Sequence, residues 1–177
     1  MGLHLYFLSD PTKVHDFNGA IADEAKIVAQ HIPITSIHQI VSVATAQCSL
    51  YQQKIKHLII SGHGSRYYAR IGHDEVGVDT VEKYAWILSQ LRPFLEPAAV
   101  VTLWGCDVGK NKELLQKLSR ILGVRVQGAI SPITVGVWGP FGYMSSEDTN
   151  VCFRTWCYTR PNFNPRAPDG MPDFLGP

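Results

Sequence analysis

Three short apolar runs, separated by segments with helix signals, constrain the fold of this chain most strongly. They are HLIIS (57–61), AAVVTLW (98–104) and VRVQGAI (124–130). Almost unbroken apolar runs of this length are typical of strands buried on both faces of a parallel sheet, whereas half-exposed strands alternate between apolar and polar residues. The three runs therefore predict a central sheet that other elements cover on both sides.

Helix signals lie between these runs. Asp79 can cap a helix in which Glu82 follows three residues later and which Pro93 ends. A second helix is expected to start near Lys110 or Asn111, to carry a leucine-rich face, and to end at Gly123. Strands that alternate with helices predict an α/β fold. We expect a three-layer sandwich with a mostly parallel central sheet and flanking helices.

The remaining segments supply further expected elements. They are strands at 3–8 and 40–44, a helix with Ile21, Ala25 and Val28 on one face, a hairpin over 66–78 with Gly72 near its turn, and strands at 133–138 and 151–158 joined by a polar, Gly-rich loop. We expect residues 1–159 to form one domain. Residues 160–177 hold five of the eleven prolines and predict an extended tail.

Composition excludes several classes of function. The 177 residues carry a net charge of only +1, so no broad basic field indicates nucleic-acid binding. The longest apolar runs are far shorter than a membrane span. The first residues lack the basic start and long apolar core of a signal peptide. The cytoplasm is therefore the expected location, with delivery into another cell as an effector left open.

The four cysteines, Cys48, Cys106, Cys152 and Cys157, contain no CxxC pair, which argues against a structural zinc site. Without a secretory signal we expect free thiols rather than disulfides. Cys152 and Cys157 lie five residues apart on one expected strand and would point to opposite faces. His73 and Asp74 could join His63 in a metal site, but their place in a hairpin turn favours exposed polar residues.

Two reactive side chains follow two of the buried runs. His63 comes after HLIISG and Cys106 comes after VVTLWG. Because ligands bind beyond the carboxyl ends of parallel strands, neighbouring strands would open both side chains onto one crevice. An imidazole can stabilise a thiolate, and the N–H groups of Gly64 and Cys106 could hold an oxyanion. Taken singly, a histidine capping a strand or a buried cysteine is more commonly structural.

HLIISGHGS followed by VVTLWGCDVG resembles the caspase-like fold of clan CD cysteine peptidases. The likeness is closest to bacterial caspase-like domains and to the self-processing protease domains of large toxins, and it covers about residues 55 to 130. The resemblance implies that His63 is the catalytic imidazole, that Cys106 is the nucleophile, and that Gly64 lies in the oxyanion region. Relatives typically use a Cys-His dyad, so we name no third catalytic residue, and the chemistry of a dyad requires no cofactor.

The resemblance also raises a question of specificity. True caspases carry QACRG around the cysteine, whereas this chain has WGCDVG, which does not support cleavage after Asp. Asp107, Glu147 and Asp148 are acidic candidates for a specificity pocket. In several relatives an acid after the cysteine selects a basic side chain, which makes Asp148 the basis of a hypothesis of Arg or Lys preference.

The expected activity is therefore that of a cysteine endopeptidase acting on a protein or peptide, with no cofactor and no identified activating partner. Two alternatives remain open. One is a caspase-like domain that binds a partner or serves as a scaffold without cleaving. The other is an effector domain that uses the cysteine for different chemistry, such as acyl transfer.

Overall fold

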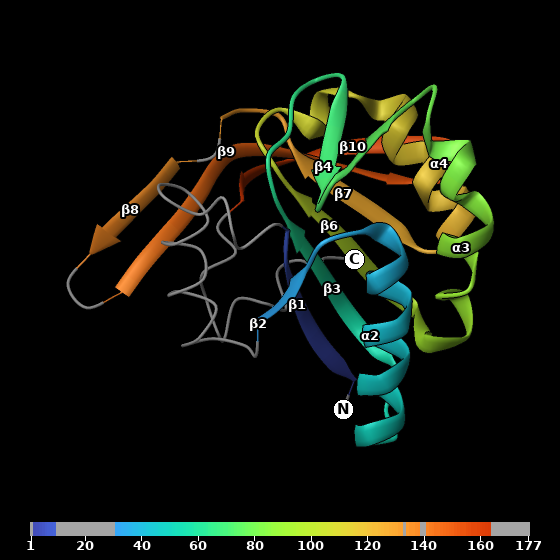
Figure 1. The fold of residues 1–177 in the computed structure, drawn as a ribbon. Helices are drawn as coiled ribbons and strands as arrows, with labels where there is room; N and C mark the ends of the chain where they lie inside the picture. Colours follow the sequence, from blue (N-terminus) through green and yellow to red (C-terminus); the bar gives the residue numbers. More distant parts are fainter. Residues whose placement is uncertain (1, 10–30, 133, 139–140, 164–177) are drawn as a thin grey trace.

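A mostly parallel central sheet with flanking helices forms the framework of the protein (Figure 1). The structure is a computed structural model that describes residues 2–9, 31–132, 134–138 and 141–163. Its elements, in chain order, are β1 (Leu3–Ser9), β2 (His31–Ile34), α2 (Ile37–Tyr51), β3 (Ile55–Ser61), β4 (Tyr68–Ile71), β5 (Asp74–Gly77), the 3-10 turn η2 (Val81–Tyr84), α3 (Ala85–Ser89), the 3-10 turn η3 (Arg92–Phe94), β6 (Leu95–Trp104), the 3-10 turn η4 (Val108–Lys110), α4 (Lys112–Leu122), β7 (Arg125–Ala129), β8 (Thr134–Trp138), β9 (Phe141–Phe153) and β10 (Trp156–Phe163).

The sheet order is β10-β9-β7-β6-β3-β1-β2, with β8 paired to β9 outside this path. Strands β2, β1, β3, β6 and β7 run parallel, while β9, β10 and β8 pair in antiparallel fashion. The three apolar runs thus become the adjacent strands β3, β6 and β7, in register through Leu58, Val101 and Val126. The prediction of an α/β fold with a mostly parallel sheet is confirmed.

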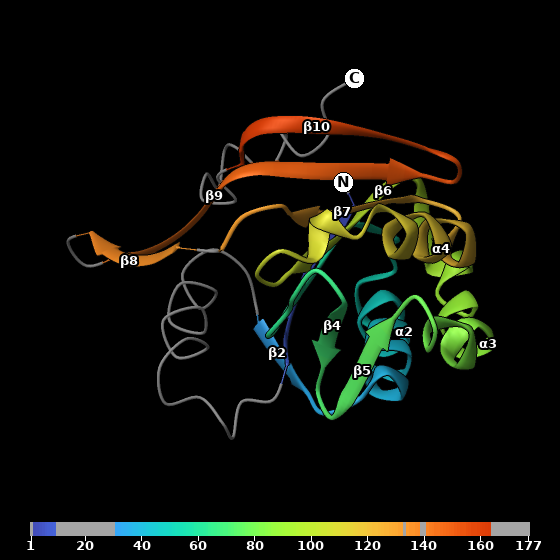
Figure 2. The ribbon, with the colours of Figure 1, turned by 90° about the horizontal axis from the view of Figure 1, so that it is seen from above.

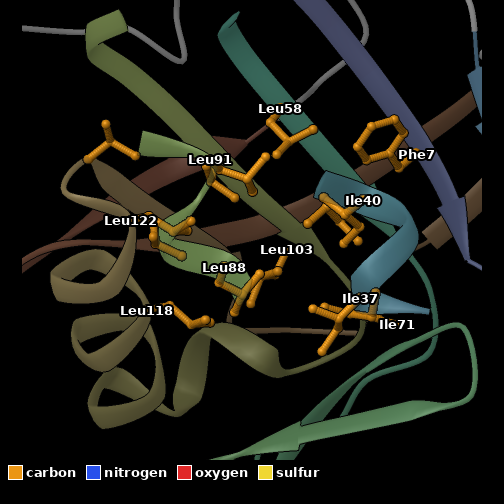
Figure 3. Packing of buried hydrophobic residues seen from close by; sticks show 14 of the residues in the cluster. Phe7, Ile37, Ile40, Leu58, Ile71, Leu88, Leu91, Leu103, Leu118 and Leu122 are labelled. Carbon is orange, nitrogen blue, oxygen red and sulfur yellow. The ribbon is translucent and has the colours of Figure 1, made fainter. Parts of the chain in front are cut away.

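One face of the sheet carries the main hydrophobic core. Helices α2, α3 and α4 lie together on this side in Figure 2, and Figure 3 shows their aliphatic side chains packed against Phe7 of β1, Leu58 of β3 and Leu103 of β6. Phe7, Ile40 and Leu58 are completely buried at the α2 contact. Burying an aliphatic side chain of this size contributes about 1.5–3 kcal/mol, so this layer holds the helices to the sheet.

The opposite face carries a row of polar side chains. The ring of His4 meets His57 edge-on at 6.0 Å, and His57 Nε2 lies 2.9 Å from Thr102 Oγ1. Gln127 Nε2 donates a hydrogen bond to the same oxygen at 2.8 Å. Burial, with a further contribution from His4, lowers the pKa of His57 to about 3. His57 is therefore a neutral imidazole, which can accept a hydrogen bond from the Thr102 hydroxyl.

Several sequence-based predictions of elements are wrong. The expected strand at 40–44 lies inside α2, because the buried residues Ile37, Ile40, Val41, Ala44 and Cys48 follow helical spacing over a longer window. Ser36 caps this helix by accepting from the Gln39 N–H. The single helix expected after Asp79 consists instead of η2, the short α3 and η3.

The C-terminal part differs most from expectation. The loop expected over 139–150 is largely the first part of β9, and the strand expected over 151–158 is a hairpin that turns at Arg154 and Thr155. Arg154 adopts a left-handed backbone with φ of 56°. β10 continues to Phe163, past the expected domain end at residue 159. The expected helix with Ile21, Ala25 and Val28, and most of the expected tail, lie outside the described residues.

The hairpin also corrects the expectation for two cysteines. Cys152 of β9 pairs directly with Cys157 of β10, and their sulfur atoms form a disulfide. A turn between them places both side chains on the same face, whereas a continuous strand would have separated them. Cys48 and Cys106 are the free thiols among the described cysteines. Disulfides persist in oxidising compartments, so this bond weighs against the cytoplasmic location, which stays a prediction. No described helix is long and apolar enough to cross a membrane.

Candidate functional site

The pairing of β3 with β6 brings His63 and Cys106 to the same edge of the sheet. Ser61 and Trp104 are the last partners in this ladder, and the Gly62 N–H donates to the Trp104 carbonyl at 3.1 Å. His63 and Cys106 each follow two residues after these last partners. Because neighbouring strands lie about 4.8 Å apart, the two residues leave the sheet side by side.

Glycines let the two loops that follow the strands touch backbone to backbone. A Cβ added to Gly64 would lie 2.3 Å from Val108 Cγ2, and one added to Gly105 would lie 3.0 Å from the Gly62 oxygen and 3.2 Å from the Gly64 nitrogen. A side chain at Gly64 would force Val108 to shift, and one at Gly105 would press against the backbone of the neighbouring loop. The glycines on both sides of His63, and the one before Cys106, therefore allow close approach of the two loops.

The loop with His63 is hydrogen-bonded to the hairpin that follows it. The Arg70 N–H donates to the His63 carbonyl at 2.8 Å, and the Ser65 N–H donates to the Tyr68 carbonyl at 2.9 Å. These two bonds flank an antiparallel bridge between Gly64 and Ala69. In such a pair the Gly64 N–H points away from the hairpin, toward the side where Gly105 packs.

Ser9, at the carboxyl end of β1, fastens this hairpin to the sheet. Its hydroxyl donates to the Arg70 carbonyl at 3.3 Å and accepts from the Gly72 N–H at 2.5 Å. The side chain is 2% exposed, and a Cβ added to Gly62 would lie 2.8 Å from Ser9 Cβ. One buried hydroxyl thus holds the end of β4 and the turn that follows it. The sequence marked Ser9 only as the end of a strand.

Asp74 anchors the turn end of the hairpin to α2. Its carboxylate accepts from the Ile37 N–H at 2.9 Å and from the Tyr84 hydroxyl at 3.2 Å. Burial, together with the charge and hydrogen bond of Asp74, raises the pKa of Tyr84. Gly72, with φ of 63°, makes the turn, as predicted. The expectation that Asp74 is merely an exposed turn residue is wrong, because its carboxylate links the hairpin to α2. His73 is exposed.

The loop with Cys106 is held from the other side by β7 and β9. The Asp107 N–H donates to the Ser131 carbonyl at 3.3 Å, and the Asn150 side chain donates to the Gly109 carbonyl at 2.8 Å. α4 begins at Lys112, close to the predicted start near Lys110 or Asn111, and the Asn111 side chain caps it by accepting from the Leu114 N–H. The turn η4 lies between Cys106 and this helix, so the cysteine is not part of the first helical turn, to which the effect of the helix dipole is confined.

The side chains of His63 and Cys106 are both accessible to a large substrate from solvent. His63 is exposed and Cys106 is half-buried. The recess beside His63, between β3, β4 and β6, is too narrow to admit a water molecule. A substrate would therefore lie across the edge of the sheet rather than enter a deep pocket.

Two of the three acidic candidates lie on either side of β7. Asp107 adopts a left-handed backbone with φ of 59° and forms an ion pair with Lys110 at 2.8 Å. Asp148 lies on β9, where its carbonyl accepts from the Ile130 N–H at 3.0 Å, just past the carboxyl end of β7. Lys110 offsets the charge of Asp107. The side chain of Glu147 lies outside the described part of the structure.

Neither a metal cluster nor a second thiol lies at this edge within the described residues. No group of three or more His, Cys, Asp or Glu side chains there could hold a metal ion. The other free thiol, Cys48, is in α2, where burial raises the pKa of its side chain. The site consists of His63, Cys106 and the backbone groups around them.

Comparison with known proteins adds one finding. Residues 12–136 match a family model described as a domain of unknown function (DUF4347). The matched segment includes His63, Cys106 and Asp107, and it ends before β9. No curated protein matches the chain.

Proposed function

Since the chain belongs to the DUF4347 family, whose function is unknown, we propose from the site itself that the protein is a cysteine endopeptidase with a dyad of His63 and Cys106. It would be a thiol hydrolase of the caspase-like type, with the three-layer fold that this resemblance implies. One observation carries the proposal. The register of β3 and β6 delivers an imidazole and a thiol to adjacent positions at the carboxyl edge of a parallel sheet.

The chemistry follows from these groups. The Cys106 thiolate attacks the carbonyl carbon of the scissile peptide bond and forms a tetrahedral oxyanion. The N–H groups of Gly64 and Cys106 donate to that oxyanion. The His63 imidazolium then gives its proton to the leaving amine, and a thioester forms on Cys106. Water, deprotonated by His63, hydrolyses the thioester and releases the acid with the free thiol.

The substrate would be an extended segment of a protein. An exposed histidine and an open sheet edge favour a chain that lies across both loops. Asp148, beyond β7, would select an Arg or Lys side chain before the cleaved bond by charge pairing. Neither the cleavage of the peptide bond nor the selection of the basic side chain requires a cofactor.

A panel of fluorogenic peptides that differ only in the residue before the cleaved bond tests the activity. We expect cleavage that falls about 1,000-fold or more in Cys106→Ala and in His63→Ala. Cys48→Ala, which removes the other free thiol, should retain the wild-type rate. Absence of cleavage by the wild type across the panel, without self-processing by mass spectrometry, would favour the scaffold alternative.

The same panel tests the specificity separately. Asp148→Asn should lower kcat/KM for Arg and Lys peptides while leaving neutral peptides unchanged, because only the cations lose a charged partner. Faster wild-type cleavage after neutral or acidic residues would refute the role of Asp148 without affecting the dyad.

A further inference from the structure

The edge of the sheet opposite to His63 and Cys106 contains a hollow of about 460 Å³. It lies where β6 begins and where α4 passes into β7, and apolar residues of these elements line part of it. A volume of this size is within the range of small-molecule sites. Four cationic residues and one carboxylate complete the lining: Lys54, Arg92, Arg120, Arg154 and Glu96.

The four cations come from parts of the chain that are far apart in sequence. Lys54 follows α2, Arg92 lies in η3, Arg120 lies in α4, and Arg154 lies at the β9–β10 turn. The fold alone brings them together, which explains why the sequence, with a net charge of +1, shows no basic cluster.

Arg92 has a structural task in this group. Its Nε donates to the Ile121 carbonyl at 2.6 Å, and its Nη2 donates to the Arg120 carbonyl at 2.7 Å. These are terminal carbonyls of α4, where a cation offsets the negative end of the helix dipole. The terminal carbonyls of α4 thus compensate the charge of Arg92 within the fold.

The other three cations lack this kind of compensation. Within the described residues, Lys54, Arg120 and Arg154 form no ion pair, and Glu96 is the one acid in the lining. Arg154 is held in place, because its N–H donates to Ser119 Oγ at 2.9 Å and its guanidinium lies over the Phe153 ring at 5.0 Å. Gathered like charges repel, and an anion between them relieves that repulsion.

We propose that this hollow binds a small molecule that carries at least two anionic groups, either phosphates or carboxylates. Two arginines on different elements can each take one anionic group by paired hydrogen bonds, and Lys54 adds a third cation. The apolar lining suits the body of such a ligand. Because the hollow lies at the opposite edge from Cys106, the proposal does not rest on the proposed function.

Calorimetric titration at low salt tests this site, with inorganic tripolyphosphate and citrate as probes. We expect saturable binding of at least one probe, at least 10-fold weaker in Arg120→Gln/Arg154→Gln. Lys83→Gln/Lys112→Gln removes two exposed cations elsewhere and serves as the control, with an affinity within about twofold of the wild type. Arg120→Gln alone should also weaken binding, which covers the case of a misfolded double variant.

Either probe binding in this pattern supports the proposal, and the preferred probe tells phosphate from carboxylate recognition. Two results would overturn it. One is the absence of saturable binding at about 10 mM of either probe, a concentration well above ordinary affinities for a built site. The other is equal weakening in the control variant, which would mean that general surface charge attracts the anion.

Discussion

Ser9 shows how a residue remote from the chemistry can hold a site together. Its hydroxyl joins the Arg70 carbonyl and the Gly72 N–H, and both belong to the hairpin whose backbone supports His63. The side chain is buried. Loss of the Ser9 hydroxyl therefore affects the position of His63 through the backbone of the hairpin.

We expect Ser9→Ala to lower the free energy of unfolding by about 1–3 kcal/mol, because two buried backbone groups lose a partner. Chemical denaturation measures this directly. Ser42→Ala, which removes an exposed hydroxyl from α2, should stay within about 0.5 kcal/mol of the wild type. Equal effects of the two substitutions would show that Ser9 does not fasten the hairpin.

Substitution of Gly64 tests whether the loop with His63 and the loop with Cys106 approach each other closely. A methyl group there would lie 2.3 Å from Val108 Cγ2, so Gly64→Ala should destabilise the fold by about 1–3 kcal/mol. Val108→Ala removes the clashing atom but also leaves a cavity. A double-mutant cycle should therefore show that the pair costs less than the sum of the single substitutions. Strict additivity would contradict the contact.

At the scale of elements, the central strands and the loops at their ends were the most predictable parts. Almost unbroken apolar runs have few structural solutions, so β3, β6 and β7 and the positions of His63 and Cys106 followed from the sequence. The hairpin turn at Gly72 and the end of α4 at Gly123 followed from glycine, which takes the positive φ that each requires.

The wrongly predicted elements lacked such local signals. Arg154 makes a tight turn without glycine or asparagine, so nothing in the sequence divided the segment 151–158 into two strands. The window 40–44 was too short to separate a strand from a helix by periodicity. The roles of Ser9 and Asp74 depend on hydrogen bonds between distant segments, which no local pattern contains.

The β9–β10 hairpin gives a prediction at this scale. Under denaturing conditions without reductant, the oxidised protein should show two reactive thiols, Cys48 and Cys106, and four after reduction. Reduction should also lower the free energy of unfolding by about 2 kcal/mol, since the disulfide closes a short loop. Four thiols in protein exposed to a mild oxidant would contradict the pairing of Cys152 with Cys157.

For the whole molecule, the buried polar row couples stability to pH. The pKa of His57 is about 3 in the folded protein, against 6.5 for an ordinary histidine. Between these values the unfolded chain binds a proton that the folded protein does not. The contribution of His57 to stability is therefore complete above pH 6.5 and falls by about 1.4 kcal/mol per pH unit down to about pH 3.

Urea denaturation at a series of pH values measures this slope. His57→Gln replaces the titrating ring with an amide that can reach Thr102. The unfolded variant lacks the proton that the unfolded wild type binds at this position, so its free energy of unfolding should change less steeply with pH, by the slope that one proton produces. The same slope in the variant and the wild type would mean that His57 is not the neutral buried group described.

The two edges of the sheet divide the molecule by chemistry. One edge presents an imidazole and a thiol on loops that glycines bring into contact, and the other gathers cations around a hollow. Strand order creates both arrangements, since neither set of residues is contiguous in sequence. The central claim concerns the first edge, where His63 is proposed to activate Cys106.

Alkylation of the native protein by iodoacetamide, with the modified cysteine mapped by mass spectrometry, tests this claim most directly. The thiolate is the reactive form, so an imidazole that stabilises it makes Cys106 react far faster than buried Cys48. We predict selective labelling of Cys106, slowed at least about 10-fold in His63→Ala and unchanged in His73→Ala, which removes another exposed histidine. Labelling of Cys106 at the same rate in His63→Ala and the wild type would contradict the dyad.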